Sequence, residues 1–330
     1  MTLPPQMTVI EMREAGEPEV LVTATRPLPD IAPHEVLIKV AAAGVNGPDL
    51  VQRRGHYPPP KGASDLLGLE VSGEIVAVGD AVQTWRTGMQ VCALTNGGGY
   101  ADYVAVNAGH CLPIPTGVSM VDAAGLPETY FTVWSNVFYQ QTITEGNRFL
   151  VHGGSGGIGS TAIQIGAAMG LSVFTTAESD KACHYCQSLG ATRAINFTTE
   201  DFVPILREAG GADIILDIIG GDYIARNIKA SRADARLIQI AFNKGSKIEI
   251  DLMPLMLKRL SLTGSTLRSR PEDFKTAIAT DLIQTVWPFF AQPSPKLKAT
   301  TFATFPLAEA SKAHALMESG TQHGKIILTN

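Results

Sequence analysis

The chain has 330 residues, of which 45% are hydrophobic and 17% charged, so it can bury more than one sizeable core and two domains are the natural expectation. Its formal net charge is −5 with no basic tract or arm, which argues against nucleic acid and against a membrane surface as partners. No 18-residue stretch is apolar without glycines, and the first residues lack the layout of a secretion signal, so we expect a cytoplasmic protein whose four cysteines stay reduced.

The first third of the chain has the pattern of a small β-domain. Short apolar runs alternate with Gly, Pro, Asn and Asp, which is typical of strands joined by turns. We expect these strands to form a small closed or partly open barrel. They lie at residues 35–46, 70–79, 88–94 and 100–106.

The segment "FLVHGGSGGIGSTAIQI" (residues 149–165) indicates a buried strand, a glycine-rich turn and a tightly packed helix. Glycines let backbone N–H groups approach a phosphate, and the N-terminus of the helix adds unpaired N–H donors. The turn has the G-x-G-x-x-G spacing, which alone is a weak signal for a dinucleotide site. Its residues are Gly154, Ser155, Gly156, Gly157, Ile158 and Gly159.

The elements that follow this turn strengthen the signal. We expect strands at 171–175, 193–197, 212–221, 236–242 and 260–266, with helices at 181–189, 201–209 and 223–230. Strands that alternate with short helices predict a doubly wound parallel sheet, whose nucleotide lies at the carboxyl ends of the strands. In that setting the glycine turn predicts a dinucleotide site.

The end of the chain departs from this alternation. We expect one long helix over about residues 272–286 and a last strand in "GKIILTN" (residues 324–330). This strand has no obvious local partner, so we expect it to return to the N-terminal barrel. The predicted domains are 1–128 together with 269–330, and 129–268.

This order of parts resembles the medium-chain dehydrogenase/reductase superfamily, and most closely its zinc-free, zeta-crystallin-like quinone oxidoreductases. The resemblance implies an α/β fold, in which a GroES-like β-barrel catalytic domain wraps a Rossmann domain with a doubly wound parallel sheet. The motifs that carry it are "AAAGVNGPDLVQRRGHYPPP" (41–60), "LGLEVSGEIVAVG" (67–79), "GGGYADYVAV" (97–106), "HGGSGGIGSTAIQIG" (152–166), "LGATRAINF" (189–197), "DIIGG" (217–221) and "GSTLRSR" (264–270).

Zinc-dependent members of this superfamily bind a catalytic zinc through Cys, His and a further ligand. The cysteine would fall near Asn46 and the histidine at Leu69, and neither residue is a preferred zinc ligand. No cysteine lies between Cys92 and Cys111, so the four closely spaced cysteines of a structural zinc lobe are missing as well. We therefore expect no metal, and we interpret Glu70 as a structural residue.

Without a metal, the protein must align a nicotinamide hydride with an electron-poor acceptor, and quinones or conjugated carbonyls accept hydride without strong acid assistance. The resemblance implies that Asn46 and Tyr57 stand near the nicotinamide and the substrate, so both are predicted catalytic residues. Tyr57 could hydrogen-bond the substrate or stack on a flat ring; alternatively, it is a loop aromatic packed against the prolines of "GHYPPP".

The choice between NADPH and NADH rests on the turn after the second strand of the Rossmann domain. Glu178 lies 19 positions after Gly159, where an acidic residue usually accepts the ribose hydroxyls of NAD. Ser179 and Lys181 instead fit a clamp for a 2′-phosphate, and Phe197 replaces a tyrosine that touches this phosphate in relatives. Because the turn can point Glu178 outward, we predict NADPH as the cofactor, with NADH as the alternative.

The resemblance implies further cofactor-binding residues. Thr132 would lie on the carboxamide side of the nicotinamide, and Lys325 of "GKIIL" is a weaker assignment. The other implied contacts are Ile240, Ala241, Phe242, Leu267 and Arg268.

The predicted function is a zinc-independent NADPH:quinone oxidoreductase whose partner is a small quinone or conjugated carbonyl. One alternative is an NADPH-dependent enone or enoyl (alkene) reductase on the same fold. Another is a non-catalytic NADPH-binding protein. The family also implies a homodimer, in which the last sheet strand near residues 260–266 pairs across a two-fold axis.

Overall fold

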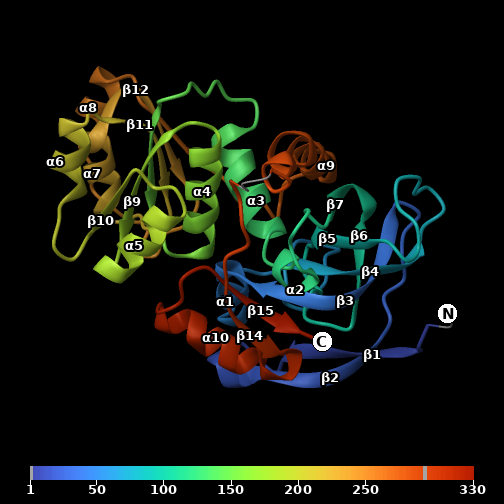
Figure 1. Cartoon of the computed structure of the whole chain (residues 1–330). Coiled ribbons are helices and arrows are strands. Elements are labelled where there is room, and N and C mark those ends of the chain that lie inside the picture. The colour runs from blue at the N-terminus through green and yellow to red at the C-terminus, as the bar shows by residue number, and fades with distance from the viewer. Residues whose placement is uncertain (1–2, 293–295) are drawn as a thin grey trace. The chain divides into compact units, whose positions relative to one another are not determined.

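The computed structural model describes residues 3–292 and 296–330, and the chain forms two compact units. The first unit comprises Met1–Phe131 together with Arg268–Asn330, and the second comprises Thr132–Leu267. Figure 1 shows the mixed strands of the first unit and the helix-covered sheet of the second.

The first unit is built on a mixed seven-stranded sheet. Its order is β14-β15-β3-β4-β5-β7, and β6 pairs antiparallel with β3 off this path. The terminal strand β15 pairs antiparallel with β3, so the predicted return of the C-terminus to the N-terminal strands is confirmed. The bounds are β3 Glu35–Val45, β4 Glu70–Val78, β5 Gln90–Leu94, β6 Tyr103–Asn107, β7 Cys111–Pro113, β14 Thr301–Pro306 and β15 Lys325–Thr329.

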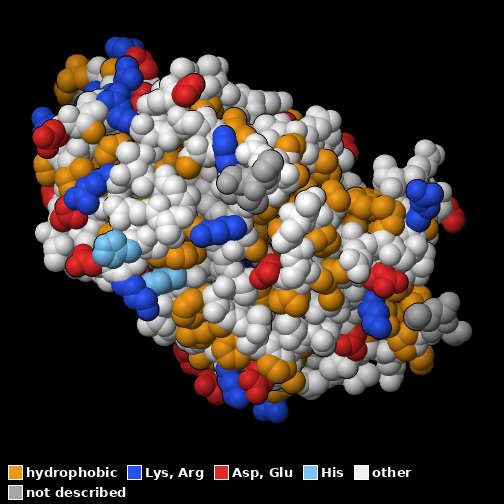
Figure 2. Space-filling model, in the orientation of Figure 1, with side chains coloured by type: hydrophobic (Ala, Val, Ile, Leu, Met, Phe, Trp, Pro, Cys, Tyr) orange, Lys and Arg blue, Asp and Glu red, His pale blue; other side chains and the backbone are white. Residues whose placement is uncertain are grey.

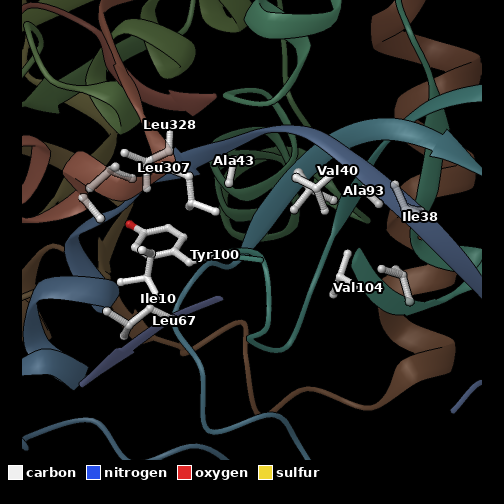
Figure 3. Close-up of a cluster of buried hydrophobic side chains, with 14 of the residues drawn as sticks. Ile10, Ile38, Val40, Ala43, Leu67, Ala93, Tyr100, Val104, Leu307 and Leu328 are labelled. Carbon is white, nitrogen blue, oxygen red and sulfur yellow. The ribbon is translucent and has the colours of Figure 1, made fainter. Parts of the chain in front are cut away.

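Buried side chains from several of these strands form the core of the first unit. Figure 3 shows Ile38 and Val40 of β3 with Ala93 of β5, and Tyr100 beside Ile10 and Leu67. Most residues of β3, β4 and β5 are buried at consecutive positions, so both faces of these strands are largely removed from water. The helices of this unit are α1 Gly47–Arg53, α2 Met120–Ala123, α9 Glu272–Asp281 and α10 Ala310–Ser319, and α3 Pro127–Val133 begins in this unit and ends in the second.

Two features of the first unit differ from the sequence prediction. An antiparallel hairpin of β1 (Gln6–Met12) and β2 (Leu21–Pro27) was not predicted, because an eight-residue connection with three glutamates separates its strands. The helix expected over about 272–286 is α-helical only to Asp281 and continues as a π-helix over Leu282–Val286.

The second unit is a six-stranded sheet in which every pair is parallel, in the order β10-β9-β8-β11-β12-β13. The order reverses between β8 and β11, which is the switch point of a doubly wound fold. The predicted fold class is therefore confirmed. The bounds are β8 Arg148–His152, β9 Ser172–Ala177, β10 Arg193–Asn196, β11 Ala212–Asp217, β12 Ser231–Gln239 and β13 Ser261–Gly264.

Helices cover both faces of this sheet. Helices α6 and α7 pack against each other and enclose a core with Ile195, Ile215 and Leu237, whereas α4 and α5 contact strands β8, β9 and β10 (Figure 1). The helices are α4 Gly157–Ala168, α5 Asp180–Ser188, α6 Phe202–Glu208, α7 Tyr223–Ala230 and α8 Met253–Leu257.

Acidic and basic side chains are interspersed over the face shown in Figure 2, and hydrophobic side chains reach the surface around α8. Within residues 3–292 and 296–330, no helix is both long and apolar enough to cross a membrane.

Candidate functional site

The glycine turn lies between β8 and α4, at the switch point of the parallel sheet. Gly156 is the N-cap of α4 and has extended backbone angles (φ −76°, ψ 178°), and no side chain caps the helix there. The first N–H groups of a 12-residue helix therefore face outward from the turn, with the positive end of the helix dipole behind them.

The glycines of this turn are required for different reasons. A Cβ atom on Gly154 would lie 2.1 Å from Thr175 Oγ1, and one on Gly159 would lie 2.2 Å from the Gly153 carbonyl oxygen. These two positions let helix, turn and strand pack closely. A Cβ on Gly156 would meet only the Gly153 oxygen, at 3.7 Å, so the space above Gly156 is open. This cradle fits a diphosphate, whose oxygens need close approach to backbone N–H groups.

A relay of hydrogen bonds behind the turn joins three strands and a helix. Asn227 Nδ2 donates to Asp217 Oδ2 at 2.8 Å, so Asn227 Oδ1 is the acceptor for His152 Nε2–H, also at 2.8 Å. His152 Nδ1 then accepts from the Thr176 hydroxyl at 3.0 Å, and the Thr176 oxygen accepts from the Gly153 N–H at 3.4 Å. Burial lowers the pKa of His152, so the ring is neutral, as the relay requires.

Glu178 directly follows β9 and points toward the glycine turn. Its Oε2 atom accepts a hydrogen bond of 2.9 Å from the Ser155 hydroxyl. The sequence allowed this carboxylate to point outward, but a hydroxyl donor in the turn holds it toward the turn. Ser179 caps α5 by accepting from the Ala182 N–H at 3.2 Å, while Lys181 and Phe197 are exposed.

The other predicted cofactor-binding residues of the second unit lie just after a strand or close to the first and last residues of the unit. Ile240 and Ala241 follow β12, where the Ile240 N–H donates to the backbone carbonyl oxygen of Asp217 at 3.0 Å, and Phe242 is 46% exposed. Thr132 is half-buried near the end of α3, and Leu267 is buried.

In the first unit, Asn46, Glu70 and Lys325 form a buried group that we call the polar cluster. Lys325 Nζ lies 2.6 Å from Asn46 Oδ1 and 2.7 Å from Glu70 Oε1. Asn46 Nδ2 donates to the same Glu70 oxygen at 2.9 Å. The oxygen and the nitrogen of the Asn46 amide are both hydrogen-bonded within the protein, so this side chain organises the cluster. The Lys325 ammonium group is likewise held by contacts within the cluster.

The polar cluster does not fit a catalytic zinc. A divalent cation would need the side-chain oxygens of Asn46 and Glu70 as ligands, but the Lys325 ammonium group already binds both. The neighbouring Leu69 side chain has no atom that could bind a metal. Across residues 3–292 and 296–330, no group of three or more His, Cys, Asp or Glu side chains is arranged to hold a metal ion.

Asp49 connects the polar cluster to helix α1. Its two carboxyl oxygens accept from the Asn46 N–H and the Gly68 N–H, both at 2.9 Å. Burial nevertheless raises the pKa of Asp49 to about 6. The first of these bonds caps the start of α1.

Tyr57 lies in the loop after α1 with its ring centre 5.7 Å from the guanidinium carbon of Arg268. Arg268 is 7% exposed and donates to Gln52 Oε1 at 2.6 Å and to the Asn96 carbonyl oxygen at 2.8 Å. Its side chain is therefore held by the first unit and supports one face of Tyr57. Burial raises the pKa of the Tyr57 hydroxyl, so it is protonated at neutral pH.

Sequence reasoning missed two charged residues of this region. Lys275 of α9 is buried and donates to Asn96 Oδ1 at 2.7 Å and to the Arg268 carbonyl oxygen at 2.9 Å. Glu128 at the start of α3 donates its backbone N–H to Glu70 Oε2 at 2.9 Å. A lysine in an amphipathic helix and an acidic residue in a first helical turn are ordinary patterns, so neither gave a signal.

Comparison with known proteins agrees with this architecture. Residues 32–116 match the alcohol dehydrogenase GroES-like domain, and residues 157–283 match the zinc-binding dehydrogenase family. These two matches define a medium-chain dehydrogenase/reductase. The chain is 30% identical over 331 residues to the quinone oxidoreductase of Rattus norvegicus, covering 98% of this chain and 97% of that protein. It therefore belongs to the quinone oxidoreductase branch of this superfamily.

Two solved structures extend the comparison. A mycobacterial protein complexed with NADPH is 26% identical with a TM-score of 0.83, and the match covers 98% of this chain and 100% of that one. The CurK enoyl reductase is 27% identical with the same TM-score of 0.83, and the match covers 99% of each chain.

Proposed function

We propose that this protein is a zinc-independent oxidoreductase that transfers reducing equivalents from NAD(P)H to quinones. The observation that carries the proposal is the polar cluster, where the Lys325 ammonium group takes the place of a Lewis-acidic metal between Asn46 and Glu70. Quinones accept hydride without such a metal. The similarity to rat quinone oxidoreductase over nearly the full length of both chains supports this substrate class.

The residues of each unit would have distinct roles. In the second unit, the N–H groups from Gly156 to Gly159 would bind the diphosphate, and the relay through His152 would keep the turn in place. When bound, the nicotinamide supplies the hydride. In the first unit, Tyr57 would offer a hydroxyl donor or a flat ring to the acceptor, and the polar cluster would fix the backbone around it.

The test is anaerobic oxidation of NADPH, followed at the nicotinamide absorbance in the presence of a chelator. We would compare 1,2-naphthoquinone, 1,4-benzoquinone and an enone, each with NADPH and with NADH. We expect quinone-dependent turnover that the chelator does not reduce. Turnover with the enone alone would move the assignment to the alternative below, and cofactor binding without turnover would make the protein a non-catalytic NADPH-binding protein.

The alternative function is NADPH-dependent reduction of an activated alkene, such as an enone or enoyl thioester. The similarity to CurK enoyl reductase favours it, and the acidic residue Glu128 beside the polar cluster is suited to the proton that an alkene requires. The two functions differ in the site at which the proton is delivered, to oxygen in a quinone and to carbon in an alkene.

For the cofactor we propose NADPH, with NADH as the alternative. Exposed Lys181 and the Ser179 hydroxyl could meet a 2′-phosphate, and the similar mycobacterial protein is complexed with NADPH. Glu178 opposes this choice, because its carboxylate faces the turn through Ser155 and would repel a phosphate. Replacing Glu178→Gly should therefore raise the ratio of kcat/KM for NADPH over NADH. An unchanged ratio would show that the carboxylate does not face the ribose.

We also propose a homodimer in a reducing cytoplasm. Strand β13 is an edge strand whose residues are all exposed, and Leu262 on it is 46% exposed. Nearby on α8, Met256 and Leu257 are 62% and 66% exposed, so the same edge offers apolar surface for a second copy. Sedimentation should give a dimer mass; a monomer mass at all concentrations would contradict this assembly.

A further inference from the structure

Glu128 is held against the polar cluster by its backbone. It is the second residue of α3, directly after Pro127, and its N–H donates to Glu70 Oε2 at 2.9 Å. The other oxygen of Glu70 binds Lys325 and Asn46. The start of α3 is therefore tied to the cluster, and the Glu128 side chain leaves the backbone at a fixed point beside it.

The carboxyl group of Glu128 is not used by the fold. Throughout the described parts of the chain, it accepts no hydrogen bond and forms no ion pair, although the side chain is partly buried. The carboxyl groups of Asp49 and Glu70, in contrast, are fully engaged by N–H donors and by Lys325. A partly buried carboxyl group that the fold does not bind is available to a substrate.

The surrounding charges favour the protonated form of this group. Burial and the negative charges of Glu70 and Asp49 raise the pKa of Glu128 to about 8, and the ammonium groups of Lys325 and Lys275 only partly oppose this. Glu128 acts in turn on the ionisation of two groups at the proposed acceptor site, the Tyr57 hydroxyl and the Arg268 guanidinium. At pH 7 the protein thus holds a carboxylic acid in this part of the first unit, and its charge influences the ionisation of Tyr57.

We propose that Glu128 is the general acid of the reaction, which gives its proton to the acceptor as the hydride arrives. This role rests on the proposed function. The acceptor gains a hydride, and so two electrons, from NAD(P)H, which becomes NAD(P)+. The acceptor also gains a proton from the Glu128 carboxyl group, whose O–H bond breaks, and the resulting carboxylate recovers a proton from water.

The acid should matter most for a carbon acceptor. The enolate left after hydride addition to an enone must be protonated at carbon, whereas a reduced quinone is protonated at oxygen, which water does readily. A positioned acid typically contributes about 10²-fold or more to a rate. Glu128 therefore extends the acceptor range of this site from quinones toward activated alkenes.

The experiment compares the wild type with Glu128→Gln over pH 6–10, using NADPH, 1,4-benzoquinone and an enone. For the wild type, kcat/KM with the enone should fall as pH rises through about 8, because only the protonated acid is active. In Glu128→Gln this alkaline limb should disappear, and kcat at pH 7 should drop by about 10²-fold with the enone. The same variant should lose less than about threefold with the quinone, because water can protonate its oxygen.

Two controls separate this role from structural damage. Glu74→Gln alters an exposed residue of β4 and should leave every rate and pH profile unchanged. Tyr57→Phe should lower the rate but keep the alkaline limb, because Glu128 is intact. Carbon-13 NMR of glutamate-labelled protein should also show one carboxyl group that titrates near pH 8 and is absent from Glu128→Gln.

Two results would overturn the proposal. One is an ionised Glu128 at pH 7 in the NMR titration, and the other is a Glu128→Gln enzyme that keeps both the alkaline limb and the enone rate. If the wild type turns over no acceptor while the NMR signal still titrates near pH 8, the proposed function itself fails, and the catalytic role falls with it.

Discussion

The two units contain buried polar networks of opposite character. In the second unit, the relay behind the glycine turn ends on Asp217, whose carboxylate accepts from Asn227 and from the N–H groups of Ile219 and Gly220. Each donor in this relay meets one acceptor. In the first unit, the Lys325 ammonium group lowers the pKa of the Asp49 and Glu128 carboxyl groups, but in the described part of that unit its one ion pair is with Glu70.

The balance of donors and acceptors determines what each of the two networks can do. A network in which every partner is satisfied holds its atoms in one arrangement, and the relay ends on the N–H of Gly153 at the start of the turn. A network with more carboxyl groups than cations retains protons, because buried like charges cannot all ionise. The first arrangement suits the immobile part of a binding site, and the second suits a proton donor.

The largest effect should follow from breaking the ionic network. Lys325→Met leaves Glu70 buried with no cation, and we expect a loss of about 3–5 kcal/mol in the free energy of unfolding, measured in urea. Lys39→Met removes an exposed lysine of β3 and should cost less than about 0.5 kcal/mol. The double variant Lys325→Met with Glu70→Gln should recover part of the loss. Equal stabilities of the Lys325 and Lys39 variants would show that the buried pair contributes nothing.

Substitutions in the glycine turn should have an intermediate effect, and two of them should separate an effect on stability from an effect on NADPH binding. Gly159→Ala forces a Cβ to within 2.2 Å of the Gly153 oxygen, so we expect a loss of about 1–3 kcal/mol in stability together with weaker NADPH binding. Gly156→Ala has room within the protein and should leave the melting temperature unchanged, yet weaken NADPH binding measured by nicotinamide fluorescence. Unaltered NADPH affinity in Gly156→Ala would mean that no phosphate approaches this residue.

The smallest effect should come from the neutral relay, and it should depend on pH. His152→Gln weakens the link between Asn227 and Thr176, and we expect it to cost about 1 kcal/mol at pH 7.5. Burial lowers the pKa of His152 in the folded state, so its contribution is complete above the unfolded pKa of about 6.5 and is lost as pH falls. The stability advantage of the wild type should therefore shrink at pH 5.

A matched control is His184→Gln, which changes an exposed histidine of α5 and should have no effect at either pH. An advantage of the wild type over His152→Gln that stays constant from pH 7.5 to pH 5 would contradict a neutral, buried His152.

Local sequence patterns were sufficient to predict the main secondary-structure elements and their division into two domains. The alternation of strands and helices after residue 148, the glycine turn and the return of the last strand were all predicted, because periodicity and turn chemistry are properties of neighbouring residues. The β1–β2 hairpin was missed, because the pairing of strands across an eight-residue connection depends on their register, which the local sequence does not specify.

The chemistry of the site was decided by tertiary structure. The sequence by itself determined the two-part architecture and the dinucleotide turn, because glycine spacing and hydrophobic period act locally. It did not determine that Lys325 meets Asn46 279 positions away, that Glu178 turns toward Ser155, or that the Glu128 carboxyl group beside Glu70 has no hydrogen-bond partner among the described residues. These contacts join distant segments, and the charge state of each group depends on the neighbours that folding brings to it.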